Sequence, residues 1–275
     1  MHSLRALVAI LLTGLLLQTA RADLLKKPDL QHEGQWKLYL YLPEGAGPHP
    51  LVVFFPGCDG WGSWERHSAQ RHRDALAGAG WGIAELDVLG ALGIASICTS
   101  DAQLEGLRDD AVRAATEAAQ ILGARDDIDE ARLVFMGQSF GGSVALDIAS
   151  PKQRQLAGVE RVFAAVIPYY PYCYDRYGMG TVADFDTPVL VQGGALDTWT
   201  PVSRCVTLAE AQAKRENPTP FVVEIYPDSY HSFDLDKMPR YDIQGYKGME
   251  VVQGNEEQAM ASRARYLAWL AEIAP

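Results

Sequence analysis

The stretch 133–142, LVFMGQSFGG, constrains the fold of this chain more than any other part of it. An apolar run ends at Gly137, Ser139 follows two positions later, and two more glycines lead into residues 143–149, which have the composition of a helix. A strand, a sharp turn with one serine, and a helix form the pattern of a nucleophile elbow. Glycines suit such a turn because a Cβ there would collide with neighbouring backbone. The alternative is an ordinary glycine-rich turn, since short motifs also arise by chance.

The first 22 residues have the pattern of a secretory signal peptide. Residues 1–5 are basic, residues 6–17 are apolar, and Ala20-Arg21-Ala22 fits a small-x-small cleavage site. Cleavage after Ala22 predicts a secreted or periplasmic protein of 253 residues, in which 22 basic against 35 acidic residues give a net charge of −13. An uncleaved anchor is the alternative, although the apolar run is short for a membrane span. So acidic a protein is poorly suited to nucleic acids or anionic membranes, and no stable membrane insertion is expected after cleavage.

Strands and helices alternate along the rest of the chain. This order predicts an α/β fold: a mostly parallel central sheet of seven to eight strands with helices on both faces, in a single domain over residues 23–275. The stretch after His231 is expected to be a polar loop as far as Gly254. The alternating, aromatic first strand suits an outer position in the sheet. The expected strands are 36–42, 51–55, 82–87, 133–138, 161–167, 188–192 and 221–226, and the expected helices are 64–79, 103–122, 143–149, 201–214 and 256–273.

Three chemically useful side chains, Ser139, Asp197 and His231, each follow the carboxyl end of a predicted strand. Those ends share one edge of a parallel sheet, where ligands bind. Their order along the chain is that of the Ser-Asp-His triad of α/β hydrolases, so Ser139 is predicted to be the nucleophile, His231 the base and Asp197 the acid. Asp197 could instead cap the helix that follows it. His231 could be a surface residue, and Asp228 is an alternative acid.

A triad of this kind needs amide donors for the oxyanion of the tetrahedral intermediate. The residue after the nucleophile, Phe140, supplies one amide. The second is expected from the loop after the strand at 51–55, and Cys58 is the chosen donor. The alternative for residues 56–60 is a plain glycine turn.

Four segments, FPGCDG at 55–60, GQSFGG at 137–142, GALD at 194–197 and YHSF at 230–233, resemble the dienelactone hydrolase family of α/β hydrolases. The resemblance runs from about residue 35 to the C-terminus. It implies an α/β-hydrolase fold without a large cap domain and the hydrolysis of esters or lactones without a cofactor or metal. A small-molecule ester or lactone is then the expected partner, for a monomer or a small homo-oligomer.

Two departures from the family bear on the substrate. The enzyme that gives the family its name uses a cysteine nucleophile, whereas this chain has Ser139. That enzyme also binds its substrate carboxylate partly through an arginine after the fourth strand, and residues 88–102 here contain no Lys or Arg. Arg204, Lys237 and Arg240 are the available substitutes. An uncharged or weakly polar ester is therefore expected rather than dienelactone.

The four cysteines are even in number, and an exported chain meets an oxidising environment. Cys58 and Cys98 lie on neighbouring strand-end loops, and so do Cys173 and Cys205, which predicts disulfides within these two pairs. Four free buried thiols are the alternative. The absence of C-x-x-C spacing argues against a structural zinc site.

The segment 168–185 is rich in aromatic residues, and it either covers the substrate pocket or packs on its own side chains. Tyr170 and Tyr172 in this segment, with Trp199, are the predicted substrate contacts. The same triad would also serve a peptidase or an acyltransferase, and a non-catalytic binding protein could retain the fold.

Overall fold

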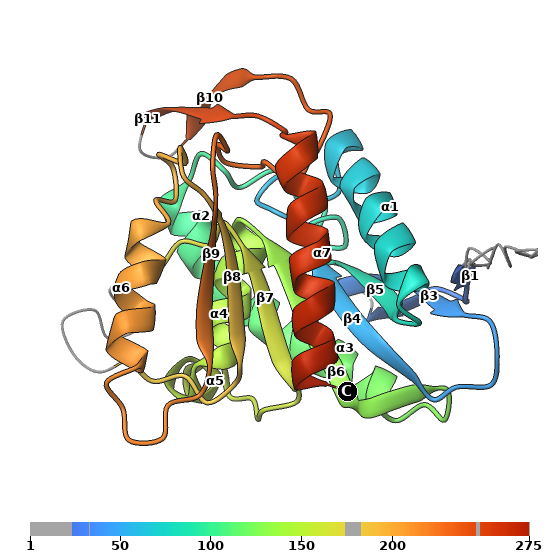
Figure 1. The fold of residues 1–275 in the computed structure, drawn as a ribbon. Coiled ribbons are helices and arrows are strands. Elements are labelled where there is room, and N and C mark those ends of the chain that lie inside the picture. Colours follow the sequence, from blue (N-terminus) through green and yellow to red (C-terminus); the bar gives the residue numbers. More distant parts are fainter. Residues whose placement is uncertain (1–23, 33, 174–182, 246–247, 275) are drawn as a thin grey trace, which may run out of the picture.

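The computed structural model describes residues 24–32, 34–173, 183–245 and 248–274 (Figure 1). The predicted signal peptide, 1–22, lies outside the described residues, as does the part of the aromatic segment at 174–182.

A twisted sheet of nine strands runs through the centre of the described chain. Six neighbouring strands, in the order β5, β4, β6, β7, β8 and β9, are parallel, and β3 pairs antiparallel with β5. The α/β fold with a mostly parallel sheet is thus confirmed. The strands are β1 (Leu24–Lys26), β2 (Leu30–His32), β3 (Trp36–Pro43), β4 (His49–Phe55), β5 (Gly82–Asp87), β6 (Ile128–Gln138), β7 (Ala165–Tyr169), β8 (Val189–Gly194) and β9 (Phe221–Tyr226).

The expected outer strand is not the outermost one. Both β1 and β2 pair antiparallel with the free side of β3. Each has only three residues, too few to show an alternating pattern in the sequence.

Helices cover both faces of the sheet (Figure 1). Helices α1 (Ser63–Gly78) and α7 (Glu256–Ile273) pack on one face. The other face carries α3 (Arg108–Gly123), α4 (Phe140–Ala149) and α6 (Ser203–Gln212), with the short helices α2 (Asp101–Gly106) and α5 (Pro151–Ala157) beside them. The helix expected over 103–122 is therefore two helices: Ser100 caps the first by accepting a hydrogen bond from the Gln103 amide, and Gly106 ends it.

The expected polar loop before α7 contains a β-hairpin instead. Strands β10 (Tyr241–Gly245) and β11 (Gly248–Val252) pair antiparallel and lie above the carboxyl ends of the central strands (Figure 1). Ile243 and Val252 turn toward a cavity there, while exposed polar residues occupy other positions. Apolar side chains on one face of so short a pair leave a weak signal in the sequence, which explains why the hairpin was missed.

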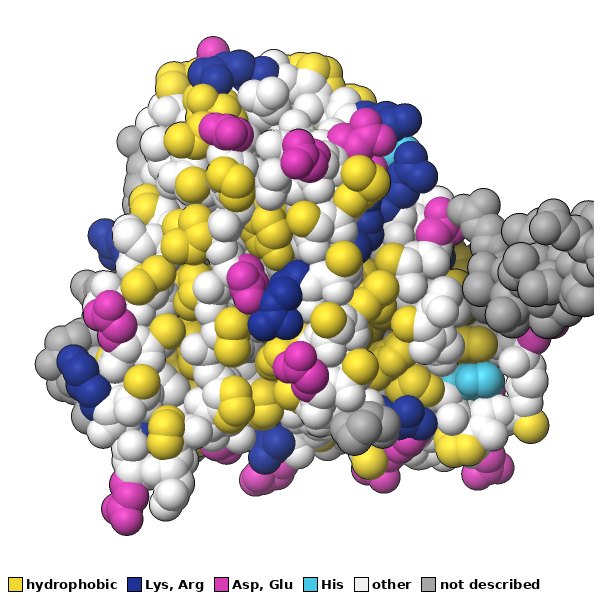
Figure 2. Space-filling view, viewed as in Figure 1, with side chains coloured by type: hydrophobic (Ala, Val, Ile, Leu, Met, Phe, Trp, Pro, Cys, Tyr) yellow, Lys and Arg dark blue, Asp and Glu magenta, His cyan; other side chains and the backbone are white. Residues whose placement is uncertain are grey.

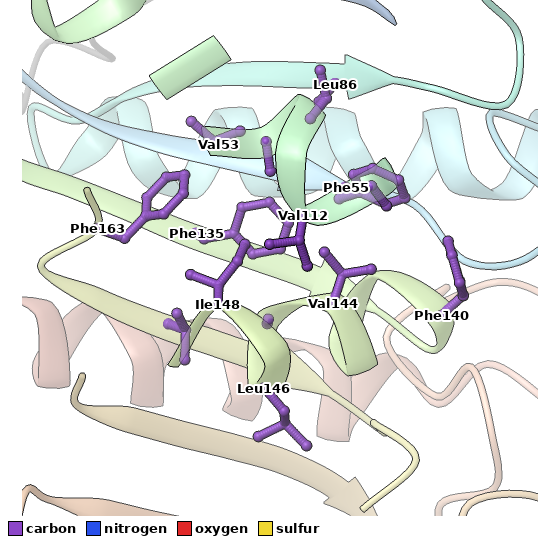
Figure 3. Packing of buried hydrophobic residues seen from close by; sticks show 14 of the residues in the cluster. Val53, Phe55, Leu86, Val112, Phe135, Phe140, Val144, Leu146, Ile148 and Phe163 are labelled. Atoms are coloured by element: carbon purple, nitrogen blue, oxygen red, sulfur yellow. The ribbon is translucent and has the colours of Figure 1, made fainter. Parts of the chain in front are cut away.

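Two apolar clusters hold the helices to the two faces of the sheet. On the α3 and α4 side, Phe55, Phe135 and Phe163 lie in a row (Figure 3), with ring centroids 6.2 Å and 5.4 Å apart in succession. Fully burying one such ring contributes about 1.5–3 kcal/mol. The strand that ends in Phe55 and the one that ends before Ser139 are thereby fixed side by side.

The surface view shows acidic and basic side chains interspersed with apolar ones (Figure 2). Among the described residues no helix combines the length and apolar character that a membrane crossing requires.

Candidate active site

The turn between β6 and α4 holds Ser139 in a strained conformation, with φ at 50° and ψ at −108°. Such a positive φ is unusual for a residue with a side chain. The turn is sharp enough that a Cβ on Gly137 would lie 2.2 Å from the Gly141 oxygen, and a Cβ on Gly141 would lie 2.6 Å from the Phe55 oxygen. The glycines around Ser139 are therefore required by the close approach of backbone to backbone.

The loops after β8 and β9 bring Asp197 and His231 to the same place. Ser139 Oγ lies 2.9 Å from His231 Nε2, and His231 Nδ1 lies 2.8 Å from Asp197 Oδ2. Because a carboxylate accepts only, Nδ1 donates to Asp197, and Nε2 is left to accept from the serine hydroxyl. Asp228, the alternative acid, is exposed. The chain thus forms an unbroken series of hydrogen bonds from Asp197 to Ser139.

Thr200 holds the carboxylate of Asp197 in place. Its amide donates to Asp197 Oδ1 at 2.8 Å, so Asp197 does cap a turn as well as contact the histidine. The Thr200 hydroxyl lies 2.8 Å from Asp197 Oδ2 and 3.1 Å from His231 Nδ1. Burial works to raise the pKa of Asp197, but His231 and the bonds from Thr200 outweigh it and hold that pKa below its ordinary value. Asp197 is therefore ionised at neutral pH.

Two aromatic rings enclose the imidazole of His231. The Tyr170 ring lies 4.6 Å from it and the Trp199 ring 4.9 Å, centroid to centroid. Two cavities, a larger and a smaller one, are lined by Ser139. Of the predicted substrate contacts, Trp199 lines both cavities and Tyr172 lines the smaller one. Tyr170 also lines the larger one, but it is 2% exposed and its hydroxyl is bonded to Asp234. Tyr170 thus supports the imidazole more than it faces a ligand.

The predicted amide donors border the same space. Phe140 is the first residue of α4, and the first amides of a helix have no partner within the helix. Cys58 lies in the loop after β4, and both residues line a cavity that Ser139 also lines.

Both predicted disulfides are present in the structure. Cys58 is bonded to Cys98, and Cys173 to Cys205. Cys58 and Cys98 both lie in the wall of the larger cavity beside Ser139. The Ile97 amide donates to the Cys58 carbonyl at 2.9 Å, so a hydrogen bond and a covalent bond fix the same loop.

The charged residues that line the cavities beside Ser139 are not the three basic residues considered as substitutes for the family's carboxylate-binding arginine. None of Arg204, Lys237 and Arg240 lines either cavity beside Ser139. The larger cavity is lined by Asp59 and Glu65 and, within the described chain, by no Lys or Arg. The smaller one is lined by Asp101, Glu105 and Arg108, and the Arg108 guanidinium pairs with Asp147 at 2.7 Å. The described residues also contain no cluster of His, Cys, Asp or Glu suited to a metal ion.

A buried polar network beneath the site was missed by sequence reasoning. Asp234 is fully buried and accepts hydrogen bonds from Tyr170 Oη at 2.6 Å, from Gln138 Nε2, and from Ser68 Oγ at 3.3 Å. His72 Nε2 lies 3.4 Å away. Burial opposes ionisation of Asp234, but its contact with His72 and the hydrogen bonds from Tyr170 and Gln138 hold its pKa below the ordinary value. The network joins the residue before Ser139 to the ring that supports His231.

The buried His72 should make stability depend on pH. Burial lowers its pKa, so the unfolded chain binds a proton that the folded chain does not, and stability is lost as pH falls below about 6.5. We expect this group to lower the free energy of unfolding by at most about 1 kcal/mol between pH 6.5 and 5.5. Chemical unfolding at the two pH values measures it. His72→Gln should show a smaller loss over this interval, and an identical loss would contradict the assignment.

The chain was then compared with known proteins. The sequence model of the Dienelactone hydrolase family matches residues 37–274. The chain belongs to the dienelactone hydrolase family. A search of curated protein sequences gave no match.

Solved structures share the dienelactone hydrolase fold at low sequence identity. A dienelactone hydrolase-like promiscuous phosphotriesterase from metagenomic libraries has a TM-score of 0.68 and 19% identity, over 91% of this chain and 99% of that one. A candidate dienelactone hydrolase of Klebsiella pneumoniae has a TM-score of 0.64 and 22% identity, over 91% of this chain and 98% of that one. A thermophilic esterase of Thermogutta terrifontis with bound butyrate has a TM-score of 0.58 and 16% identity, over 94% of this chain and 96% of that one.

Proposed function

We propose that this protein is an exported serine hydrolase that cleaves a carboxylic ester or lactone through Ser139, His231 and Asp197. The observation that carries the proposal is the series of hydrogen bonds of 2.8 Å and 2.9 Å that ends at a serine in a strained turn. Membership of the dienelactone hydrolase family supports it, and so does the Thermogutta structure, whose protein is an esterase.

In the acylation step, Ser139 Oγ attacks the carbonyl carbon of the ester while its proton passes to His231 Nε2. The carbonyl oxygen becomes an oxyanion, which the amides of Phe140 and Cys58 stabilise by about 3 kcal/mol each. When the carbon–oxygen bond breaks, His231 returns the proton to the oxygen of the leaving alcohol. In a lactone that alcohol stays attached to the acyl group.

In the deacylation step, water takes the place of the alcohol. His231 accepts a proton from the water as its oxygen attacks the acyl carbon, and then returns the proton to Ser139 Oγ as the acid departs. Asp197 keeps the proton on Nδ1 and stabilises the imidazolium, which its low pKa allows because the carboxylate stays ionised.

Export is supported by two independent features. Residues 1–22 have the signal-peptide pattern, and two disulfides are typical of an oxidising compartment.

A fluorophosphonate probe tests the proposal directly, because it reacts only with an activated serine. We expect one label per chain, on the peptide that contains Ser139, and labelling that competes with p-nitrophenyl acetate. Hydrolysis of a panel of esters, lactones and peptides then separates the substrate classes. Absence of both the label and ester turnover would overturn the proposal.

A further inference from the structure

Ser139 lies at the junction of two cavities of unequal size. Both are lined by Ser139, Cys58 and Trp199. The larger has a volume of about 300 Å³ and the smaller about 40 Å³. A substrate bound to Ser139 would therefore extend one part into each, so the two volumes bear on the choice of substrate. This inference rests on the proposed ester hydrolysis.

The position of His231 decides which part of the ester occupies which cavity. His231 lines the larger cavity, whereas the residues that line the smaller one do not include it. The imidazole must deliver its proton to the oxygen of the leaving group, so that oxygen has to lie beside Nε2. The alcohol then occupies the larger cavity, and the acyl chain is directed into the smaller one.

The smaller cavity has room for only a short chain. A single water needs about 10–15 Å³, so the space beyond Ser139 accommodates about three non-hydrogen atoms. The large apolar and aromatic side chains in its lining are Leu104, Phe140, Tyr172 and Trp199, and the charged ones are Asp101, Glu105 and Arg108. Leu104 is half-buried on the short helix α2 and packs against the core. Arg108 is held by Asp147 and by the Ser143 carbonyl, at 2.7 Å and 3.1 Å.

The larger cavity suits a bulky leaving group without negative charge. Leu235 and Met238 contribute apolar surface, and Tyr241 and Ile243 of the β10–β11 hairpin add to it. Asp59 and Glu65 are the acidic groups in its lining. Burial raises the pKa of Glu65, yet Asp59 remains exposed, so an anionic alcohol would be repelled.

We propose that the smaller cavity, lined in part by Leu104, is an acyl site for chains of two or three carbons, and that the larger cavity receives the alcohol. The preferred substrates are then acetyl or propionyl esters of larger, uncharged alcohols.

The test is a series of p-nitrophenyl esters from acetate to octanoate, with the alcohol held constant. We expect kcat/KM to fall by at least about tenfold between propionate and hexanoate, as a pocket that lacks room for methylenes predicts. Leu104→Ala should raise the hexanoate-to-acetate ratio of kcat/KM by about tenfold. The matched control is Leu156→Ala on α5, which removes the same atoms from a side chain that is 61% exposed and should leave the ratio unchanged.

A Met238→Ala variant tests the assignment of the cavities. It should change the ranking of acetate esters of different alcohols and leave the acyl-chain ranking as in the wild type. Equal turnover of acetate and octanoate would overturn the inference while ester hydrolysis stands. If the ranking of acyl chains changed in Met238→Ala but not in Leu104→Ala, the acyl chain would have to occupy the larger cavity. That result would also overturn the inference. Loss of all ester turnover together with the fluorophosphonate label would instead remove the proposed function itself.

Discussion

Replacing Ser139 by alanine is expected to lower kcat for p-nitrophenyl acetate by at least about 10⁴-fold. The variant loses the nucleophile but keeps the amides of Phe140 and Cys58, so a small residual rate over water should remain. Stability should change little, because alanine and serine share the Cβ that the strained turn already accommodates, and among the described residues the hydroxyl bonds to His231 alone. Initial rates and the midpoint of thermal unfolding measure the two effects.

The matched control is Ser203→Ala, which alters an exposed serine at the first position of α6. It should retain wild-type kcat. If Ser139→Ala kept more than a few per cent of the activity while folded, another group would have to be the nucleophile.

Removing the Cys58–Cys98 disulfide by a double substitution to serine is expected to affect both stability and rate. The bridge spans 40 residues, and closing a loop of that length stabilises the folded state by about 4 kcal/mol in the chain-entropy account. Because the bridge also fixes the amide of Cys58, kcat should fall by about 10²-fold, the effect of one lost oxyanion donor. Denaturant unfolding and steady-state kinetics measure the two quantities separately.

The second disulfide is the natural control for this experiment. Cys173–Cys205 spans 32 residues, so its removal should cost a similar free energy of unfolding. It does not hold the loop after β4, and kcat for p-nitrophenyl acetate should fall by much less. Equal losses of kcat in both double variants would show that the first bridge acts on activity only through general stability.

The order of the main elements could be predicted because buried strands have a plain sequence signal. Residues 51–55 and 133–136 are continuous apolar runs, and both are buried parts of strands in the parallel sheet. The closing helix over 256–273 begins after Asn255, whose side chain accepts from the Gln258 amide. The hairpin of β10 and β11 could not be predicted in this way, because its strands are short and gain their order by packing over the site.

The residues around the site differ in how visible they are in the sequence. Ser139, Asp197 and His231 stand out because each follows a strand and their order is distinctive, and the structure brings them within hydrogen-bond distance. Asp234 and Thr200 have no such signal. Their importance comes from contacts with Tyr170 and Asp197 that only the folded chain creates.

The hairpin above the larger cavity and the loop of His231 are parts of one unit. His231 forms a bridge with Val252 at the end of β11, and the Gln253 amide donates to the His231 carbonyl at 3.1 Å. A force that lifted the hairpin would therefore also pull the imidazole away from Ser139. The order of the hairpin and the position of the imidazole beside Ser139 are therefore coupled through these two contacts.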